Sequence, residues 1–235
     1  KKANKENIDP ELFLEYFRTL HKPNEDKRFD DKFAKFINDE LRLNDSKIDI
    51  DVLDKSITEK EIMVATKLLK NKKASGYDSI SNEMIKYSIH IMKPILVKLF
   101  NAALHSEYFP KCWTEGYIVP IHKSGDELDP SNYRGITISN CIGKLFTRIM
   151  NTRLLKFIDD ENMIKHNQIG FMPKHRTSDH ILVLKTLIDC FKNARKSLYL
   201  CFVDLKKAFD TLYHDCHIYK LKQLHFSTKF INIIK

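Results

Sequence analysis

The spacing of hydrophobic and polar residues divides most of the chain into predicted helices and one pair of strands. Apolar residues alternate with other residues in the segments 116–121 and 133–138, which predicts two strands that pair as a hairpin. Elsewhere apolar residues recur every three or four positions, which predicts amphipathic helices. These helices cover residues 59–72, 82–106, 142–158, 178–194 and 217–224. A helix-rich chain with one small antiparallel sheet indicates the α+β fold class.

Local signals refine the ends of these helices. Thr58 and Glu61 have the spacing of a capping box, in which each side chain accepts a hydrogen bond from the backbone of the other residue. Pro94 interrupts the long helix, and because proline lacks a backbone N–H we expect it to kink or split the helix. Residues 10–17 begin with a proline and fit a short helix. They belong to an N-terminal extension, residues 1–56, that we expect to be loosely attached.

Composition and charge narrow the class of partner. The 235 residues include 43% hydrophobic side chains, enough for a real core, and no apolar run approaches the roughly 20 residues of a membrane span. Five scattered cysteines without a Cys-x-x-Cys pair argue against a disulfide framework and a zinc site. Residues 61–235 hold 27 Lys and Arg against 16 Asp and Glu, which suits a polyanion, nucleic acid before membrane. The polar N-terminus predicts an intracellular protein.

One stretch concentrates the candidate chemistry. An apolar, β-prone run from Leu198 to Val203 delivers a carboxylate, Asp204, at its end, and a helical pattern follows through Leu212. An uninterrupted apolar run predicts a strand buried on both faces. Such a strand keeps an aspartate at its end where solvent, a metal or a partner charge meets it, but aspartate is also a common helix cap. The residues leave these two roles for Asp204 equally open.

Three further residues have side chains suited to a nucleotide. Lys123 ends the first predicted strand and Arg134 starts the second, so a hairpin can bring two cations toward one phosphate group. Phe209 follows Asp204 at the turn into the helix, where an aromatic face can lie beside a bound ring. Each has an ordinary alternative, since many cations are solvated loop residues and most phenylalanines are core residues. The carboxylate of Asp204 suits Mg²⁺, which takes few protein ligands and keeps waters and substrate phosphates.

Six segments occur in the order that one family shows. Across residues 57–215 the chain resembles the reverse transcriptase of non-LTR (LINE-type, jockey-like) retrotransposons. Each segment alone is weakly specific, but six in the family's order make a strong match. Group II intron and retron enzymes share the Asp-bearing strand, whereas the Trp113 block and the context of Arg134 fit LINE-type elements better. The segments are Lys73–Ile80, Trp113–Asp126, Pro130–Ile138, Gly143–Phe146, Gln168–Phe171 and Phe202–Asp210.

The resemblance implies a right-hand polymerase and a role for each site residue. Asp204 would be the first catalytic aspartate, binding two Mg²⁺ ions with help from the backbone carbonyl of Leu205. Lys123 and Arg134 would bind the triphosphate of an incoming dNTP. Phe209 would be the steric gate that leaves no room for a ribose 2′-hydroxyl. A second, looser group would lie along the template or near the nucleotide pocket, and its members are Gln168, Gly170, Phe171 and Arg176.

The same resemblance divides the chain and names its partners. It implies an N-terminal helical extension and linker (1–56), polymerase fingers (57–197) and the start of a truncated palm (198–235). The family's Tyr-x-Asp-Asp element is absent from these residues, so we expect the chain to lack the C-terminal palm and thumb of the same polyprotein and to be inactive alone. The implied function is RNA-directed DNA synthesis by two-metal nucleotidyl transfer to a primer 3′-hydroxyl. Its partners would be an RNA template, a DNA primer or target, and dNTP, in the nucleus.

Two other hypotheses stand beside this one. The chain could be a non-catalytic nucleic-acid-binding remnant of such an element, whose basic fingers still hold RNA. Binding that weakens linearly on a log scale with salt would be its signature. It could also be a remnant that does not fold stably because a sheet edge stays unpaired. A broad, non-cooperative thermal transition would mark that state.

Overall fold

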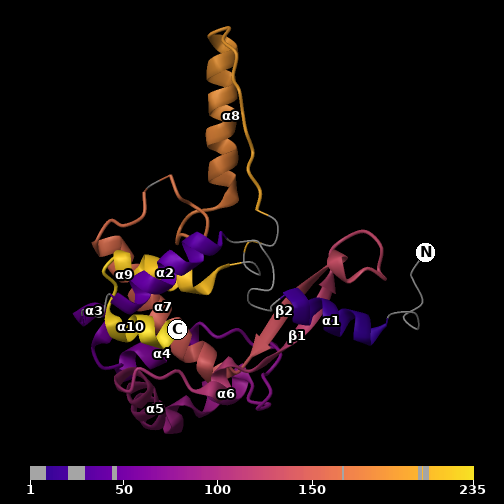
Figure 1. Ribbon diagram of the computed structural model, residues 1–235. Coiled ribbons are helices and arrows are strands. Elements are labelled where there is room, and N and C mark those ends of the chain that lie inside the picture. The colour runs from indigo at the N-terminus through magenta and orange to yellow at the C-terminus, as the bar shows by residue number, and fades with distance from the viewer. Residues whose placement is uncertain (1–8, 21–29, 44–46, 166, 206–207, 209–211) are drawn as a thin grey trace. The chain divides into compact units, whose positions relative to one another are not determined.

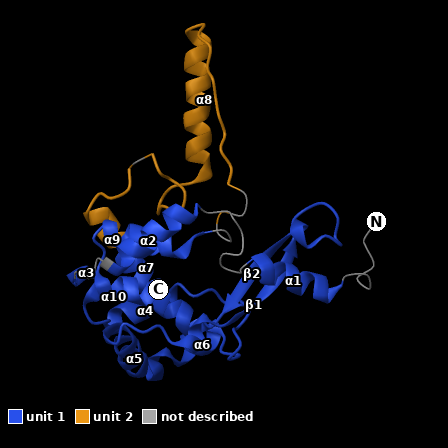
Figure 2. Ribbon diagram, in the orientation of Figure 1, with its two compact units in different colours: residues 1–154, 209–235 blue, residues 155–208 orange. Residues whose placement is uncertain are grey.

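The computed structural model describes residues 9–20, 30–43, 47–165, 167–205, 208 and 212–235. The chain divides into two compact units, residues 1–154 with 209–235 (unit 1) and residues 155–208 (unit 2) (Figure 2). Its described part is rich in helices and has one two-stranded sheet (Figure 1), as the sequence predicts. The elements are α1 (Pro10–Leu20), α2 (Asp31–Leu43), α3 (Asp51–Asp54), α4 (Glu59–Lys67), α5 (Asn82–His105), α6 (Lys111–Thr114), β1 (Gly116–His122), η2 (Pro130–Asn132), β2 (Tyr133–Ser139), α7 (Cys141–Asp160), α8 (Thr177–Asn193), α9 (His214–Gln223) and α10 (Thr228–Ile234).

Local signals in the sequence predict the start of α4 correctly, but one expected interruption, a split of α5 at Pro94, does not occur. The capping box of α4 is confirmed: the Thr58 N–H donates to Glu61 Oε2 at 2.9 Å, and the Glu61 N–H donates to Thr58 Oγ1 at 3.3 Å. The expected split at Pro94 is wrong, because α5 runs through it as one helix. Pro94 and His90, whose carbonyl loses its helical donor, both lie on the exposed side of α5. Water can therefore satisfy that carbonyl, and the helix continues.

Helix α4 ends at Lys67, short of the predicted end. The Ala65 and Thr66 carbonyls accept the N–H groups of Leu68 and Leu69, which closes the last turn of the helix. Side chains of α5 bind the carbonyls that follow. Lys86 Nζ donates to the Leu69 carbonyl at 3.1 Å, and Asn82 Nδ2 donates to the Lys70 carbonyl at 2.8 Å. These two bonds hold the turn that leads from α4 into α5.

The core of unit 1 lies where α5, α6 and α7 meet. Phe100 packs edge-on against Trp113 and Phe146, with ring centroids 5.8 and 5.4 Å apart, and Phe109 lies 5.4 Å from Trp113. A Cβ on Gly143 would lie 2.8 Å from the Cβ of Trp113, so α7 approaches Trp113 this closely only with glycine at this position. Buried aromatic rings contribute both area and edge-to-face geometry. This cluster fixes α7 beside the base of the hairpin.

Helix α1 packs against the hairpin of β1 and β2, and Figure 1 shows the three side by side. The ring of Phe13 meets Tyr133 edge-on with centroids 4.8 Å apart. A Cβ on Gly135 would lie 2.8 Å from the ring of Phe17, so glycine makes room for that ring on β2. Phe13 and Phe17 are both buried. The expectation that the N-terminal segment is loosely attached is therefore wrong for α1.

The segment from residue 47 to α3 is also held firmly, by the last helix of the chain. The Thr228 N–H donates to the Ile48 carbonyl at 2.8 Å, and the Ile48 N–H donates to Thr228 Oγ1 at 2.9 Å. Ser227, fully buried, donates its hydroxyl to the carboxylate of Asp54. The segment that precedes α4 and the last described helix thus belong to one packed unit.

The predicted buried strand from Leu198 to Val203 is wrong. Residues 196–205 have no regular secondary structure, and Phe202 is 80% exposed. A strand forms only where its backbone groups find a partner, and the strands of the described residues, β1 and β2, pair with each other. The predicted helix that follows lies partly outside the described residues, and the next described helix, α9, begins at His214.

Candidate nucleic-acid interface

The hairpin places the two predicted nucleotide-binding cations on one face. Ile121 pairs with Arg134, and the Lys123 N–H donates to the Asn132 carbonyl at 2.9 Å, which extends the pairing beyond β1. Paired residues point to the same face of a sheet, and so do residues two positions apart. Lys123 and Arg134 therefore share a face, and both are exposed. Helix α1 packs over Gly135 on the opposite face and leaves the cationic face to a ligand.

The segment Lys73–Ile80 is fastened to the junction of β2 and α7. A Cβ on Gly76 would lie 2.8 Å from the backbone N and Cα of Asn140, so the glycine allows two backbone segments to touch. Asn140 Nδ2 donates to the carboxylate of Asp78, and its Oδ1 accepts two of the first N–H groups of α7 at 2.8 and 3.2 Å. Two motifs that are far apart in the sequence thus form one structural element.

A groove of about 930 Å³ opens between the turn after α4, the end of β2 and helix α7, all within unit 1. We call it the basic groove, because its lining includes four cations and no Asp or Glu. None of the four forms a salt bridge with any other described residue. Ile136 and Ile138 of β2 add apolar surface. The four cations are Lys70, Lys73, Lys144 and Arg148.

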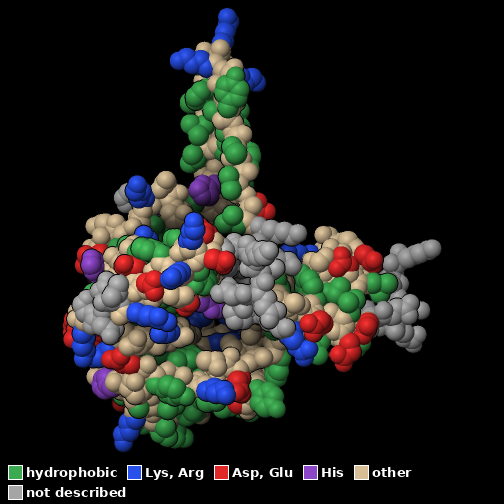
Figure 3. Space-filling view, in the orientation of Figure 1, with side chains coloured by type: hydrophobic (Ala, Val, Ile, Leu, Met, Phe, Trp, Pro, Cys, Tyr) green, Lys and Arg blue, Asp and Glu red, His purple; other side chains and the backbone are tan. Residues whose placement is uncertain are grey.

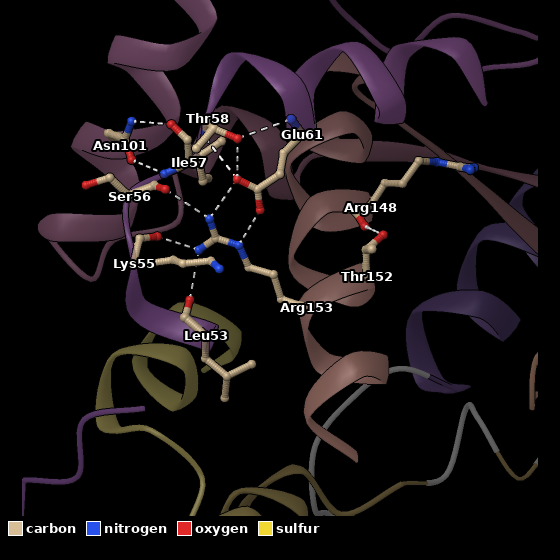
Figure 4. Close-up of polar contacts among 10 residues, drawn as sticks. All are labelled: Leu53, Lys55, Ser56, Ile57, Thr58, Glu61, Asn101, Arg148, Thr152 and Arg153. Atoms are coloured by element: carbon tan, nitrogen blue, oxygen red, sulfur yellow. Dashed lines mark hydrogen bonds and ion pairs between the residues drawn. The ribbon is translucent and has the colours of Figure 1, made fainter. Parts of the chain in front are cut away.

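Arg153, five residues further along α7, has a different environment from Arg148 (Figure 4). Arg153 is 4% exposed and forms two hydrogen bonds to the carboxylate of Glu61, at 2.7 and 3.1 Å. Its guanidinium also donates to three backbone carbonyls, and Figure 4 shows Arg148 directed away from this cluster. One side of α7 is therefore structural, and another side lines the basic groove. The carbonyls belong to Leu53, Lys55 and Ser56.

The pKa of Glu61 reflects this cluster. Burial acts to raise the pKa, but the hydrogen bonds from Arg153 and Thr58 outweigh burial and hold the pKa of Glu61 below its ordinary value. Glu61 is therefore ionised at neutral pH and neutralises Arg153. This arginine is bound within the protein and contributes no free charge to a ligand.

The remaining predicted site residues belong to unit 2, apart from Phe209, which lies outside the described residues. Asp204 and Leu205 are exposed, in a segment without regular secondary structure. Gln168 Nε2 donates to the carbonyl of Gly170 at 3.1 Å, so these two form one local turn.

Two exposed residues flank the start of α8 in unit 2. Phe171 is 88% exposed and has a left-handed backbone, with φ of 63°, which is uncommon for a bulky residue. Arg176 is exposed at the N-cap of α8, and its N–H donates to the carboxylate of Asp179 at 2.8 Å. Both side chains are exposed in the described structure.

The predicted metal site needs more ligands than Asp204 and Leu205 supply. Among the described residues, no group of three or more His, Cys, Asp or Glu could hold a metal ion. The carboxylate and one backbone carbonyl are oxygen ligands of the kind that Mg²⁺ prefers. They form an incomplete set for two ions, whose other ligands would come from substrate phosphates, water or further residues.

The cations of the basic groove are the functional candidates that the sequence does not single out. A helical pattern places Lys144 and Arg148 only on the outward side of a helix, and Lys73 only in a basic turn. Lys73 and Lys144 fall within two of the segments that carry the family resemblance, and the spacing of four residues between Lys144 and Arg148 puts both on the same side of α7. The groove itself depends on how α4, β2 and α7 pack.

Comparison with known proteins shows the class of protein that this chain resembles. Residues 121–235 match the family Reverse transcriptase (RNA-dependent DNA polymerase). One relative, "RNA-directed DNA polymerase from mobile element jockey" of Drosophila melanogaster, is 30% identical over 171 residues, 72% of this chain and 19% of the relative. Another, "Probable RNA-directed DNA polymerase from transposon BS" of the same species, is 31% identical over 183 residues, 77% of this chain and 20% of the relative.

The chain therefore carries part of a reverse transcriptase domain. Its relatives are polymerases of non-LTR retrotransposons, which confirms the resemblance that the six segments show. The chain spans about a fifth of the length of these curated relatives. No described helix has the length and apolar character that a membrane crossing requires.

Proposed function

We propose that this chain supplies the nucleotide-binding and template-binding surface of an RNA-directed DNA polymerase from a non-LTR retrotransposon. The observation that supports this most is the hairpin, which holds Lys123 and Arg134 on one open face. Both cations lie within residues 121–235, which match the reverse transcriptase family. A bidentate guanidinium and an ammonium on one face suit a triphosphate. In this proposal residues 57–197 are the fingers, and residues 198–235 begin the palm.

The other residues take the roles that the family resemblance implies. The reverse transcriptase family generally uses divalent metal ions, and such ions, when bound, neutralise phosphate charge and activate a 3′-hydroxyl. Asp204 and the carbonyl of Leu205 would each supply an oxygen ligand. Phe209 would exclude a ribose 2′-hydroxyl from the nucleotide site. The template residues would be those around the start of α8, and the place of action would be the nucleus. The template group is Gln168, Gly170, Phe171 and Arg176.

The test is primer extension on an RNA template by the full-length protein of the element. We expect Asp204→Asn to reduce dNTP incorporation to background and to leave template binding nearly unchanged. Asp189→Asn is the matched control, because Asp189 is an exposed carboxylate on α8 of the same unit. Undiminished synthesis by the Asp204→Asn protein would refute the role of this aspartate.

A second function, nucleic-acid binding without catalysis, is supported by the basic groove, which does not depend on Asp204. The two proposals differ in one outcome. If the full-length protein binds RNA in a salt-dependent way but incorporates no dNTP under any divalent metal, the non-catalytic function holds. Template-dependent synthesis by the unmodified protein excludes it.

A further inference from the structure

The two cations of the hairpin lie at its outer end, opposite to the end that joins the core of unit 1. The strand register runs from Gly116 with Ser139 to His122 with Tyr133, and Ser139 leads directly into α7 of the core. Arg134 follows Tyr133, so it belongs to the outer end. A two-stranded hairpin alone is at best marginally stable in water and needs packing against another element, such as a helix. The position of Arg134 therefore depends on what packs against the outer end.

Helix α1 supplies this packing through two aromatic rings (Figure 1). The ring of Phe13 meets the ring of Tyr133 edge-on, with centroids 4.8 Å apart. The ring of Phe17 fills the space beside Gly135, where a Cβ would lie 2.8 Å from it. Tyr133 and Gly135 share one face of β2 and Arg134 has the other, because side chains alternate along a strand. Both phenylalanines are 8% exposed, and α1 supports the backbone of Arg134 from behind while its side chain stays exposed.

The ring of Tyr133 extends the influence of α1 to both strands and to the loop between them. This ring lies 5.1 Å from the ring of His122, its partner across the hairpin. Its hydroxyl donates to the Glu127 carbonyl of the loop at 2.9 Å. Lys123 follows His122 directly in the chain. The contact between Phe13 and Tyr133 therefore helps to hold the strand that carries the second cation as well.

We propose that Phe13 and Phe17 are positioning residues of the triphosphate site, which touch no ligand and act through β2 to hold Arg134 in place. This inference rests on the proposed function, in which Lys123 and Arg134 bind the incoming dNTP. A bidentate contact between a guanidinium and a phosphate requires a fixed geometry. A group that is already in place binds its ligand without the free-energy cost of ordering. Helix α1 therefore contributes to dNTP affinity, although it precedes every segment of the family resemblance.

The test is the steady-state kinetics of primer extension by the full-length protein of the element, on a homopolymeric RNA template with the matching dNTP varied. Phe17→Ala should raise the KM for dNTP about tenfold, because a displacement of about 1 Å in a site can cost about a hundredfold. The kcat and the KM for the primed template should change by less than about twofold, as expected when only dNTP binding is weakened. Leu14→Ala is the matched control and should leave the KM for dNTP unchanged, because Leu14 lies on the same helix and is 51% exposed.

Two further variants separate positioning from a loss of folded protein. Phe17→Leu keeps an apolar side chain of similar size and should restore most of the dNTP affinity. Arg134→Gln removes the group through which Phe17 acts, so adding Phe17→Ala to it should raise the KM for dNTP little further. A phenylalanine that only stabilises the fold would lower kcat in both backgrounds and leave the KM unchanged, and that result would overturn the inference.

The outcomes also distinguish this inference from the proposed function. An unchanged KM for dNTP in Phe17→Ala, together with a raised KM in Arg134→Gln, overturns the inference and leaves the proposed function intact. An equal rise in Leu14→Ala does the same, because the buried rings would then have no particular role. An unchanged KM in Arg134→Gln overturns both, since this arginine would then not bind the triphosphate.

Discussion

Helices α5 and α8 have similar amphipathic patterns and opposite surroundings. α5 buries Leu96 and Phe100 completely in the core of unit 1. α8 of unit 2 has no buried residue, and Ile181 and Leu182 are 63% and 65% exposed. Figure 3 shows hydrophobic side chains along the length of α8. The comparison teaches that an apolar stripe predicts a helix but does not tell whether another element packs against that stripe. The buried contacts that stabilise the described chain therefore lie in unit 1.

The largest expected effect tests this difference directly. Phe100→Ala should lower the free energy of unfolding by about 3–5 kcal/mol, because it removes a fully buried ring and leaves a cavity. Leu182→Ala on α8 should change it by less than about 0.5 kcal/mol. Urea denaturation followed by circular dichroism measures both. Similar losses in the two variants would show that α8 is packed in solution.

The second prediction compares two arginines of α7. Arg153→Met should lower the free energy of unfolding by about 3 kcal/mol, at the lower end of the cost of breaking a buried ion pair, because Glu61 stays partly solvated. Arg148→Met should cost less than about 0.5 kcal/mol, since its side chain is exposed and has no ion pair with a described residue. Thermal and urea unfolding of the two variants measure the loss of unfolding free energy in each. A cost for Arg148 equal to that for Arg153 would contradict the division of α7 into a structural and a ligand side.

The smallest effect is a pH dependence within unit 1. In the folded chain the hydrogen bonds from Arg153 and Thr58 outweigh burial and lower the pKa of Glu61 below its ordinary value. Its ionised form therefore stabilises the fold above the unfolded pKa, and this contribution is lost as the pH falls through the folded pKa. We expect unfolding free energy to decrease on acidification from about pH 5 to about pH 3, with a shallower decrease in Glu61→Gln. If the unfolding free energy of the unmodified chain and of Glu61→Gln decreases equally with falling pH, ionised Glu61 does not stabilise the fold.

What the sequence predicts well is local. The capping box at Thr58, the long helix α5 and the strands of the hairpin depend on neighbours a few residues away, and each is where the pattern places it. The resemblance to the reverse transcriptase family rests on six short segments that occur in the family's order. The split that Pro94 suggests does not occur, because its exposure on α5 lets the helix continue.

What the sequence misses depends on distant partners. The apolar run before Asp204 has the composition of a buried strand, but a strand also needs a neighbour to pair with, and these residues have none among the described strands. The ring of Phe17 in α1 packs against β2 where Gly135, distant in sequence, leaves room for it. Lys144 and Arg148 are ordinary outward-facing cations until the turn after α4 forms the other wall of the groove. The sequence pattern does not predict helix α10, whose first residues bind the segment that precedes α4.

The bonds between Ile48 and Thr228 have a consequence for synthesis of the chain. They join residues 180 positions apart, and residues 155–208 are an insertion between the two parts of unit 1. At about 5–20 residues per second, a ribosome needs roughly 3–10 s to make that insertion. During this interval the surfaces that later receive α9 and α10 are uncovered. Contacts this distant in sequence also slow folding, so unit 1 cannot complete its packing until α10 has emerged from the ribosome.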